Sequence, residues 1–454
     1  MKRLLSVLLL AALLLLGVTG CGQSPASGGA GSGASSAPAP ASSGVVSRPD
    51  PIREPDPEPA APARSPTDYD NRFSSMTGAS VADVEGAWVF MPLWASNLFY
   101  ADPATGDCGP LCGKPECTHT DKDCSSYVGS NGQFVNYYDG KLYYLASFFN
   151  QAKRTTEYGL WRQDPDGTNR EFLADFLQGF QDEFGVPYNL IVHRGSVYIQ
   201  TRKQTVKDAA PVESFLIVRA DLQKPDEFTL LAERSSGFGL KGCTCVAEDY
   251  LYLCISTWTE ELGVLRNEVF RIDRKTGAEE PLFLAEDADW NVYTMFVTDE
   301  GVIYLSANIS PWDNGHPVVF RLEGGELVTV ADLGAEEEHV ANAVFTDGLI
   351  VSFVVREWNS TGTMGFVYDA WVLDLEGNTL YKGVWEPQYR QIPADQEFPD
   401  MRIVLGGEKD YFLIFFRDGI NYVAYLVRYD VTPEGLRETV LCEADVGLFV
   451  TRIS

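Results

Sequence analysis

Four cysteines and a histidine within one short stretch are the residues whose types and spacing could do chemistry: Cys108, Cys112, Cys117, His119 and Cys124. Thiolates and imidazoles are the ligands that Zn²⁺ prefers, and Cys112, Cys117, His119 and Cys124 could supply a Cys₃His shell. Such a shell leaves no open position for catalysis. The spacing matches no standard zinc module, so two disulfides, a structural metal and free thiols all remain open, and each of the three is structural.

The remaining cysteines are predicted to lie mainly in one hairpin. Without Cys21 the chain has eight cysteines, including the four already described. This even number favours disulfides in an exported protein. A turn at Glu248 and Asp249 would place Cys243 opposite Cys254 as a hydrogen-bonded pair, too far apart at Cα for an easy bridge. Free buried thiols are the alternative for these two and for Cys245, and Cys442 has no evident partner.

The elements that must position these residues are β-strands. Apolar strands, tight turns and variable loops recur with a period of about 50 residues, which predicts four strands per repeat and a β-propeller. The clearest repeat runs from the strand Phe134–Tyr138 to Glu171–Leu173. Seven repeats are predicted, and residues 447–453 are expected to add a strand to the first blade and so close the ring. The expected fold is all-β, a propeller of seven four-stranded blades.

The end of the third strand in each repeat carries a family resemblance. An aromatic residue or Leu, then Arg, any residue and Asp, precedes a Gly turn, as in Phe270 to Asp273 before Gly277 and, in looser form, Phe320 to Glu323 before Gly324. This ending resembles the TolB-like propellers, and the layout resembles uncharacterised propeller lipoproteins of anaerobic Gram-positive bacteria. The segment Leu111–His119 resembles a recurring motif of that group. The resemblance implies a propeller lipoprotein and no settled activity.

One face of the predicted propeller is the candidate binding face. The turns between first and second strands are short, whereas the loops between second and third strands are long and irregular, and ligand sites favour variable loops. Tryptophans occur on those loops or on a link between blades, and flat side chains suit sugar rings or protein partners. The candidate binding residues are Trp94, Trp258, Trp290, Trp312 and Trp358. Packing of these rings under their own loops is the alternative.

The N-terminal residues predict that the protein is located outside the cytoplasm. Lys2 and Arg3 precede an apolar run over residues 4–16, so residues 1–20 are predicted to be a signal peptide. The segment Val18–Cys21 resembles the lipobox of bacterial lipoproteins, which implies a diacylglyceryl group on Cys21 and anchoring to the cell membrane. Residues 21–66, rich in Ser, Ala, Gly and Pro, are predicted to be a disordered linker, and residues 67–454 the propeller.

Charge and motifs narrow the expected function. The formal net charge of −29 disfavours nucleic acid as a partner. No hydrolase, phosphate-loop, dinucleotide or zinc-protease motif occurs. The chain is therefore expected to be a non-catalytic binding or scaffold module for a protein or glycan, with no cofactor except a structural zinc. The alternative is a polysaccharide lyase or other glycan-active enzyme, with carboxylates and His316 or His339 in the central well.

Overall fold

The structure is a computed structural model that divides into two units, residues 1–58 and 59–454. The first unit lies outside the described residues. The structure describes residues 71–72, 80–91, 96–102, 104–119, 123–129, 133–150, 154–177, 179–207, 210–259, 265–309, 316–334, 342–358, 366–385, 400–405, 409–416 and 423–445. Within these ranges no helix is both long enough and apolar enough to cross a membrane.

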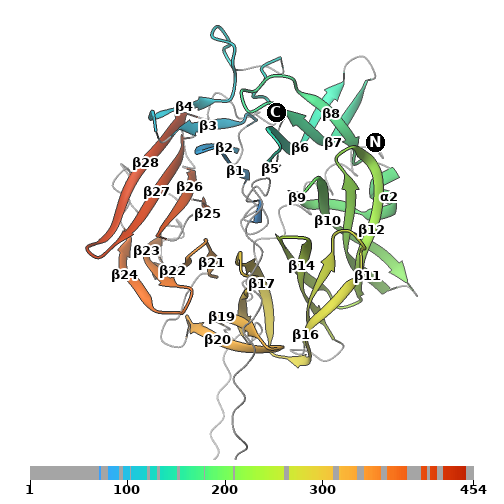
Figure 1. Ribbon diagram of the computed structural model, residues 1–454, viewed down its shortest axis with the longest axis vertical. Helices are drawn as coiled ribbons and strands as arrows, with labels where there is room; N and C mark the ends of the chain where they lie inside the picture. The colour runs from blue at the N-terminus through green and yellow to red at the C-terminus, as the bar shows by residue number, and fades with distance from the viewer. Residues whose placement is uncertain are drawn as a thin grey trace, which may run out of the picture. The chain divides into compact units, whose positions relative to one another are not determined.

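The described strands form seven antiparallel sheets of four strands each, and within each sheet the strands follow the chain order (Figure 1). The first sheet contains β1 (Ser80–Val84), β2 (Ala87–Met91), β3 (Phe99–Asp102) and β4 (Asp107–Pro110). The second contains β5 (Gln133–Tyr138), β6 (Lys141–Asn150), β7 (Thr155–Gln163) and β8 (Glu171–Asp175). The third contains β9 (Val186–His193), β10 (Ser196–Lys207), β11 (Ala210–Asp221) and β12 (Lys224–Ser236).

The remaining four sheets repeat this plan. The fourth contains β13 (Leu240–Ala247), β14 (Tyr250–Trp258), β15 (Leu265–Asp273) and β16 (Glu279–Ala288). The fifth contains β17 (Trp290–Val297), β18 (Ile303–Ile309), β19 (His316–Glu323) and β20 (Glu326–Asp332). The sixth contains β21 (Val344–Phe345), β22 (Leu349–Trp358), β23 (Phe366–Asp374) and β24 (Thr379–Trp385). The seventh contains β25 (Asp400–Leu405), β26 (Asp410–Phe416), β27 (Val423–Thr432) and β28 (Gly435–Asp445).

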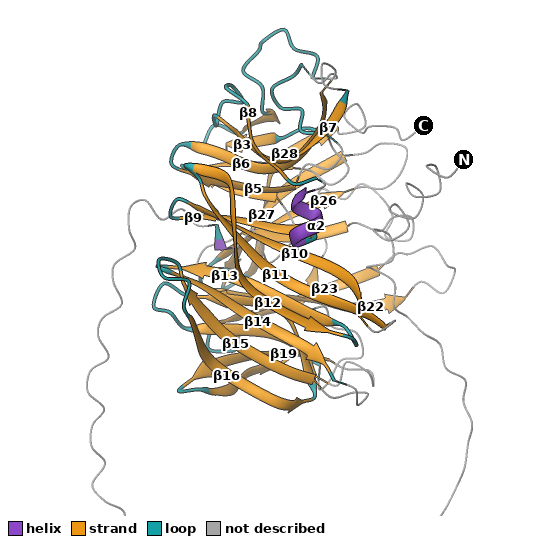
Figure 2. Ribbon diagram, turned by 90° about the vertical axis from the view of Figure 1, so that its right-hand side faces the viewer, coloured by secondary structure: helices purple, strands orange, loops and turns teal. Residues whose placement is uncertain are grey.

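One short helix interrupts the pattern. The helix α2 (Gly179–Phe184) lies in the link between the second and third sheets (Figure 2) and was not predicted from the sequence. It buries Phe180 and Phe184 against the second and third sheets, where Phe176 packs on the Phe180 ring. Six residues give no sustained helical period, so the sequence offered too short a pattern to detect it.

The tight turns between first and second strands follow directly from their residues. Asp139 and Gly140 both have positive φ, 48° and 72°, and Arg194 and Gly195 repeat this with 45° and 79°. Two consecutive residues with positive φ make a turn whose twist matches that of antiparallel strands. The hairpins predicted at these positions are confirmed.

The core clusters lie between neighbouring sheets, so the sheets pack as the blades of a propeller. Ala82 and Leu142 belong to the cluster of the first and second sheets, and Leu190 and Leu145 to that of the second and third. Similar clusters join the third to the fourth, the fourth to the fifth and the sixth to the seventh sheet. A further cluster joins the fifth, sixth, seventh and first sheets. The prediction of an all-β propeller with four-stranded blades is confirmed.

The first and last sheets also contact each other. Strand β28 contacts β4 and β3, and β25 contacts β1, so side-chain packing joins the two ends of the series. The first sheet consists of β1 to β4, all from the N-terminal part of the unit. Residues 447–453, predicted to close the ring, lie outside the described residues.

Asn71 and Arg72, which precede β1, form hydrogen bonds to several sheets at the ends of their first strands. Asn71 is 4% exposed, and its side-chain amide donates to the carbonyl of Tyr137 at 3.0 Å and to that of Val192 at 2.7 Å. Tyr137 lies near the end of β5 and Val192 near the end of β9, beside their tight turns. Asn71 therefore links the second and third sheets at the tight-turn face.

Arg72 links the fifth and sixth sheets at the tight-turn face. Its guanidinium donates to the Val297 carbonyl at 2.9 Å and forms ion pairs with Asp299 at 3.1 Å and Asp347 at 2.9 Å. It also lies over the Phe296 ring, 5.3 Å from the centroid. We call Asn71 and Arg72 the hub residues, because together they bond to four sheets at the ends of their first strands.

Gly159 in β7 permits an unusually close approach of β8, and Gly159→Ala is expected to lower the free energy of unfolding by about 3 kcal/mol. A Cβ at this position would lie 1.8 Å from the Ala174 carbonyl oxygen, which belongs to the backbone and cannot rotate away. Gly109 in β4 is the matched control, since its Cβ would meet nothing closer than a Tyr100 ring carbon at 3.9 Å. Urea unfolding of both variants measures the difference, and equal midpoints for the two would contradict the prediction.

Candidate metal centre

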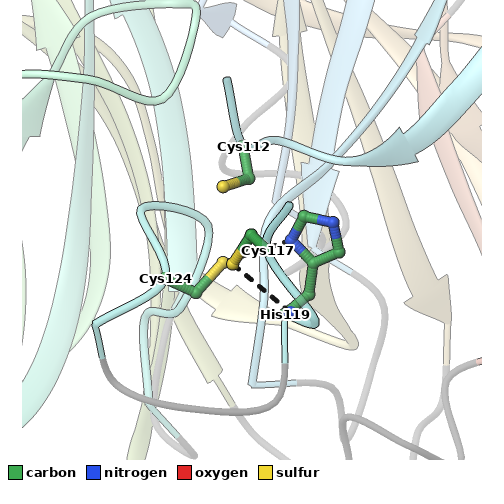
Figure 3. Close-up of side chains that lie close together, drawn as sticks. All are labelled: Cys112, Cys117, His119 and Cys124. Atoms are coloured by element: carbon green, nitrogen blue, oxygen red, sulfur yellow. Dashed lines mark hydrogen bonds between the residues drawn. The ribbon is translucent and has the colours of Figure 1, made fainter. Parts of the chain in front are cut away.

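Four of the five residues singled out in the sequence converge in the link between the first and second sheets. The ligating atoms of Cys112, Cys117, His119 and Cys124 all lie within 4.8 Å of one another. Figure 3 shows these side chains side by side, with the Cys117 and Cys124 sulfurs adjacent. Cys124 is fully buried and the other three are half-buried. These residues could hold a metal ion.

Cys108, the fifth residue singled out in this stretch as a metal or disulfide candidate, lies apart from the cluster. It lies in β4, opposite Ala101 of β3, and packs against the core that joins the first and last sheets. The strand ends at Pro110, so Cys108 is fixed by the sheet while the cluster begins in the link beyond it.

Backbone hydrogen bonds tie the returning part of the link to the first sheet. The Leu98 amide donates to the Ser126 carbonyl at 2.8 Å, and the Val128 amide donates to the Ser96 carbonyl at 2.7 Å. Between these two bonds, Asn97 forms an isolated antiparallel bridge. The link is therefore a hydrogen-bonded extension of the first sheet on this side, which fixes the backbone next to Cys124.

The buried side chain of Asn97 supports two of the potential ligands and was missed in the sequence. Its amide donates to the His119 carbonyl at 3.2 Å and to the Ser126 hydroxyl at 2.8 Å, and that hydroxyl lies 3.0 Å from the Cys124 sulfur. His119 has a left-handed backbone, with φ 58°, and its Nδ1 lies 3.4 Å from the Cys124 sulfur. Bonds of this kind orient metal ligands from the second layer of residues.

The thiols of Cys112 and Cys124 differ in their pKa values. Burial opposes ionisation of Cys112, yet hydrogen bonds from Ser125 and from the Lys114 backbone lower its pKa to about 6. Burial raises the pKa of Cys124 to about 11, and the neighbouring Cys117 and Cys112 thiols push it in the same direction. Three thiolates packed this closely would repel one another, and a bound cation would relieve that repulsion.

The donor set fits zinc. Tetrahedral Zn²⁺ with Zn–S bonds of about 2.3 Å separates its sulfur ligands by about 3.8 Å, within the 4.8 Å spread of this cluster. An open depression of about 580 Å³ borders Cys117 and would give a metal ion access from solvent. The depression is lined by Gly113, Lys114, Pro115, Glu116, Cys117 and Asp123.

The link also packs on the second sheet. A Cβ on Gly167, in the turn between β7 and β8, would lie 2.4 Å from the Leu111 carbonyl and 3.1 Å from the Ser125 hydroxyl. Gly113 approaches the Asp166 carbonyl of the same turn, with 3.4 Å between that oxygen and a Cβ built on the glycine. A metal ion in the cluster would therefore fasten a segment that bridges the first and second sheets.

The other described cysteines also form no disulfide. No disulfide joins any of the eight described cysteines, so the two disulfides considered for the link are not formed in this structure. Cys243 lies opposite Cys254, as predicted from the turn at Glu248, and both are buried together with Cys245. Cys442, for which the sequence showed no partner, lies beside Cys108 in the core between the last and first sheets.

The structure describes the side chains of two of the five candidate tryptophans. Trp290 is 7% exposed, with its ring 5.5 Å from that of Phe320, so it packs in a core and offers little surface to a ligand. Trp258 is half-buried and its amide donates to Gly239 at 3.1 Å. Beside Gly239, Phe238 is 58% exposed, an aromatic residue that the sequence analysis missed. Trp94, Trp312 and the side chain of Trp358 lie outside the described residues.

Searches against known proteins found similarity only among solved structures. No protein-family model matches the chain, and no curated protein matches it. An acylaminoacyl peptidase in complex with Z-Gly-Gly-Phe-chloromethyl ketone is 11% identical with a TM-score of 0.46, over 82% of this chain and 54% of that one. The chain thus spans about half the length of this peptidase.

Two further solved structures match more of their own length. The β-propeller domain of the trilobed protease from Pyrococcus furiosus is 9% identical with a TM-score of 0.38, over 70% of this chain and 95% of that one. An oligogalacturonate lyase in complex with manganese is 10% identical with a TM-score of 0.41, over 79% and 89%. Similarity at this level does not extend to activity.

Proposed function

We propose that the protein is a non-catalytic binding or scaffold module, a β-propeller lipoprotein tethered outside the cell membrane through Cys21. In this proposal a structural zinc ion, held by Cys112, Cys117, His119 and Cys124, fixes the link between the first two blades. The partner is a protein or a glycan, bound on the face opposite the tight turns. The lipid anchor and the TolB-like kinship rest on the sequence resemblances described above.

The character of the metal cluster is the observation that carries the non-catalytic part of the proposal. A shell of three cysteines and one histidine would leave no position for water or substrate, as in structural zinc sites. Among the described residues no Asp or Glu is buried, whereas catalytic acids and bases are tuned by burial and close partners. In this proposal the metal cluster therefore has a structural role.

The placement of His316 also favours binding over glycan cleavage. His316 begins β19, and its Nε2 lies 3.0 Å from Asp332 of β20, the outermost strand of the fifth sheet. A lyase centre would need His316 to meet carboxylates on the innermost strands, around the central well. This contact directs His316 to the other edge of the sheet, and His339 lies outside the described residues.

Phe238 gives the binding proposal its sharpest test. Phe238→Ala is expected to weaken binding of the partner at least about tenfold, because exposed aromatic residues on loops often anchor an interface. Tryptophan fluorescence titrated with a panel of cell-wall glycans and of envelope proteins finds the partner and measures its affinity. Val328→Ala in β20 is the matched control, since Val328 is 41% exposed near the tight-turn face.

Two outcomes would contradict this proposal. Equal affinities for the Phe238 and Val328 variants would remove the binding face from this link. Release of unsaturated sugars from any polysaccharide of the panel, followed by ultraviolet absorbance, would instead establish the lyase alternative.

A further inference from the structure

Cys108 and Cys442 come from opposite ends of the propeller and lie in one core. Cys108 is in β4, the outermost strand of the first sheet, and Cys442 is in β28, the outermost strand of the last. These two strands contact each other, and Figure 1 shows them side by side. The two residues are separated by almost the whole of the folded unit, so only the closing of the ring brings them together.

The registers of the two sheets show that both side chains face the same core. Cys108 lies opposite Ala101, and Cys442 lies opposite Leu426. Ala101 and Leu426 are each fully buried in the cluster that also contains Cys442 and contacts Cys108. Strand β28 contacts β4, so the two side chains lie in the same part of this core. Burial raises the pKa of Cys442, and the adjacent Cys108 thiol raises it further.

We propose that Cys108 and Cys442 form a disulfide that covalently joins the first and last sheets. The two thiols would exchange with a disulfide-bearing oxidant, which gains two electrons and two protons and leaves as two thiols. One S–S bond then forms between Cys108 and Cys442. Cys108 is half-buried and is the thiol that the oxidant would reach first, while Cys442 is 2% exposed and would resolve the mixed disulfide.

A disulfide between Cys108 and Cys442 would join the last and first sheets, which no link in the sequence connects. A propeller opens most easily between its last and first blades, since every other pair is joined by a link in the sequence. A disulfide there would restrict the unfolded chain across nearly all of the unit, the case in which cross-links stabilise most. The presence of the bond in the cell rests on the proposed extracytoplasmic location, because disulfides persist in oxidising compartments.

Peptide mapping of the oxidised full chain tests the inference. The purified protein is incubated with oxidised glutathione, quenched with N-ethylmaleimide in denaturant and digested without reduction. We expect mass spectrometry to find a linked peptide pair containing Cys108 and Cys442. We also expect the oxidised protein to melt about 5 °C higher than the protein treated with a phosphine reductant.

The variants separate this bond from other thiol chemistry. Cys108→Ser and Cys442→Ser should each abolish the oxidation-dependent rise in Tm, whereas Cys245→Ser, in the core of the fourth and fifth sheets, should keep it. Recovery of both residues as N-ethylmaleimide adducts after oxidation, or a bond from Cys108 to another cysteine, would overturn the proposal. Because oxidation is done in vitro, such a failure is distinct from a failure to find lipid on Cys21, which would instead refute the proposed location.

Discussion

Arg72→Met should unfold with a free energy about 3 kcal/mol lower than that of the unsubstituted protein. The guanidinium is buried, with 6% of its side chain exposed, and it joins the fifth and sixth sheets through Val297, Asp299 and Asp347. Methionine keeps the unbranched apolar part of the side chain but can donate none of these bonds. The two carboxylates are partly exposed and can return to water, which keeps the expected loss below that of a fully buried pair.

Arg437→Met provides the matched control for this variant. Arg437 pairs with Asp430 at 2.9 Å, but its side chain is 68% exposed, so its loss should change the unfolding free energy by less than about 1 kcal/mol. Urea unfolding, followed by tryptophan fluorescence, compares the two variants. If the urea midpoints of both variants move by the same amount, Arg72 contributes no more to the unfolding free energy than an exposed arginine, and the prediction is wrong.

Loss of one ligand of the metal cluster should weaken zinc binding more than about 100-fold. In Cys117→Ser the thiolate is replaced by a hydroxyl, a poor zinc ligand, while the rest of the link can keep its hydrogen bonds to residues 96–98. Competition with a chromogenic zinc chelator measures the affinity. Limited proteolysis should then cut the link in the variant and leave the sheets intact, because most residues of their cores lie in the strands.

Two further variants show whether the loss is specific to the metal. Glu116→Gln changes an exposed neighbour of Cys117 and should leave zinc binding unchanged. Asn97→Ala should weaken it about 10- to 100-fold, because Asn97 positions the His119 carbonyl and the Ser126 hydroxyl. Equal zinc affinity in Cys117→Ser and the unsubstituted protein would rule out this cluster as the site.

Features encoded by neighbouring residues could be predicted from the sequence. The turn at Asp139 and Gly140 has a strong local signal, and counting back from Glu248 gave the pairing of Cys243 with Cys254. The cluster of Cys112 with its neighbours was visible for the same reason, since its members lie within one link. Local backbone chemistry decides each of these features.

Features that depend on ring closure could not be predicted. Cys108 was grouped with the cysteines nearest to it in sequence, although its neighbour in space is Cys442. Arg72 lies next to a stretch predicted to be a linker, and its partners Asp299 and Asp347 are more than two hundred residues away. Spacing along the chain carries no information about such contacts, because they arise only when sheets that are distant in sequence come together in the ring.

The position of the hub residues has a mechanical consequence. Tension applied to the N-terminal end of the chain reaches Asn71 and Arg72 before it reaches β1, the innermost strand of the first sheet. Without the hub, such a load would peel β1 away from β2, one hydrogen bond at a time. With the hub, it is shared among the ends of β5, β9 and β17 and the turn at Asp347, which must yield together. A protein held by its N-terminus could in this way resist shear that would unravel a propeller pulled by a single strand.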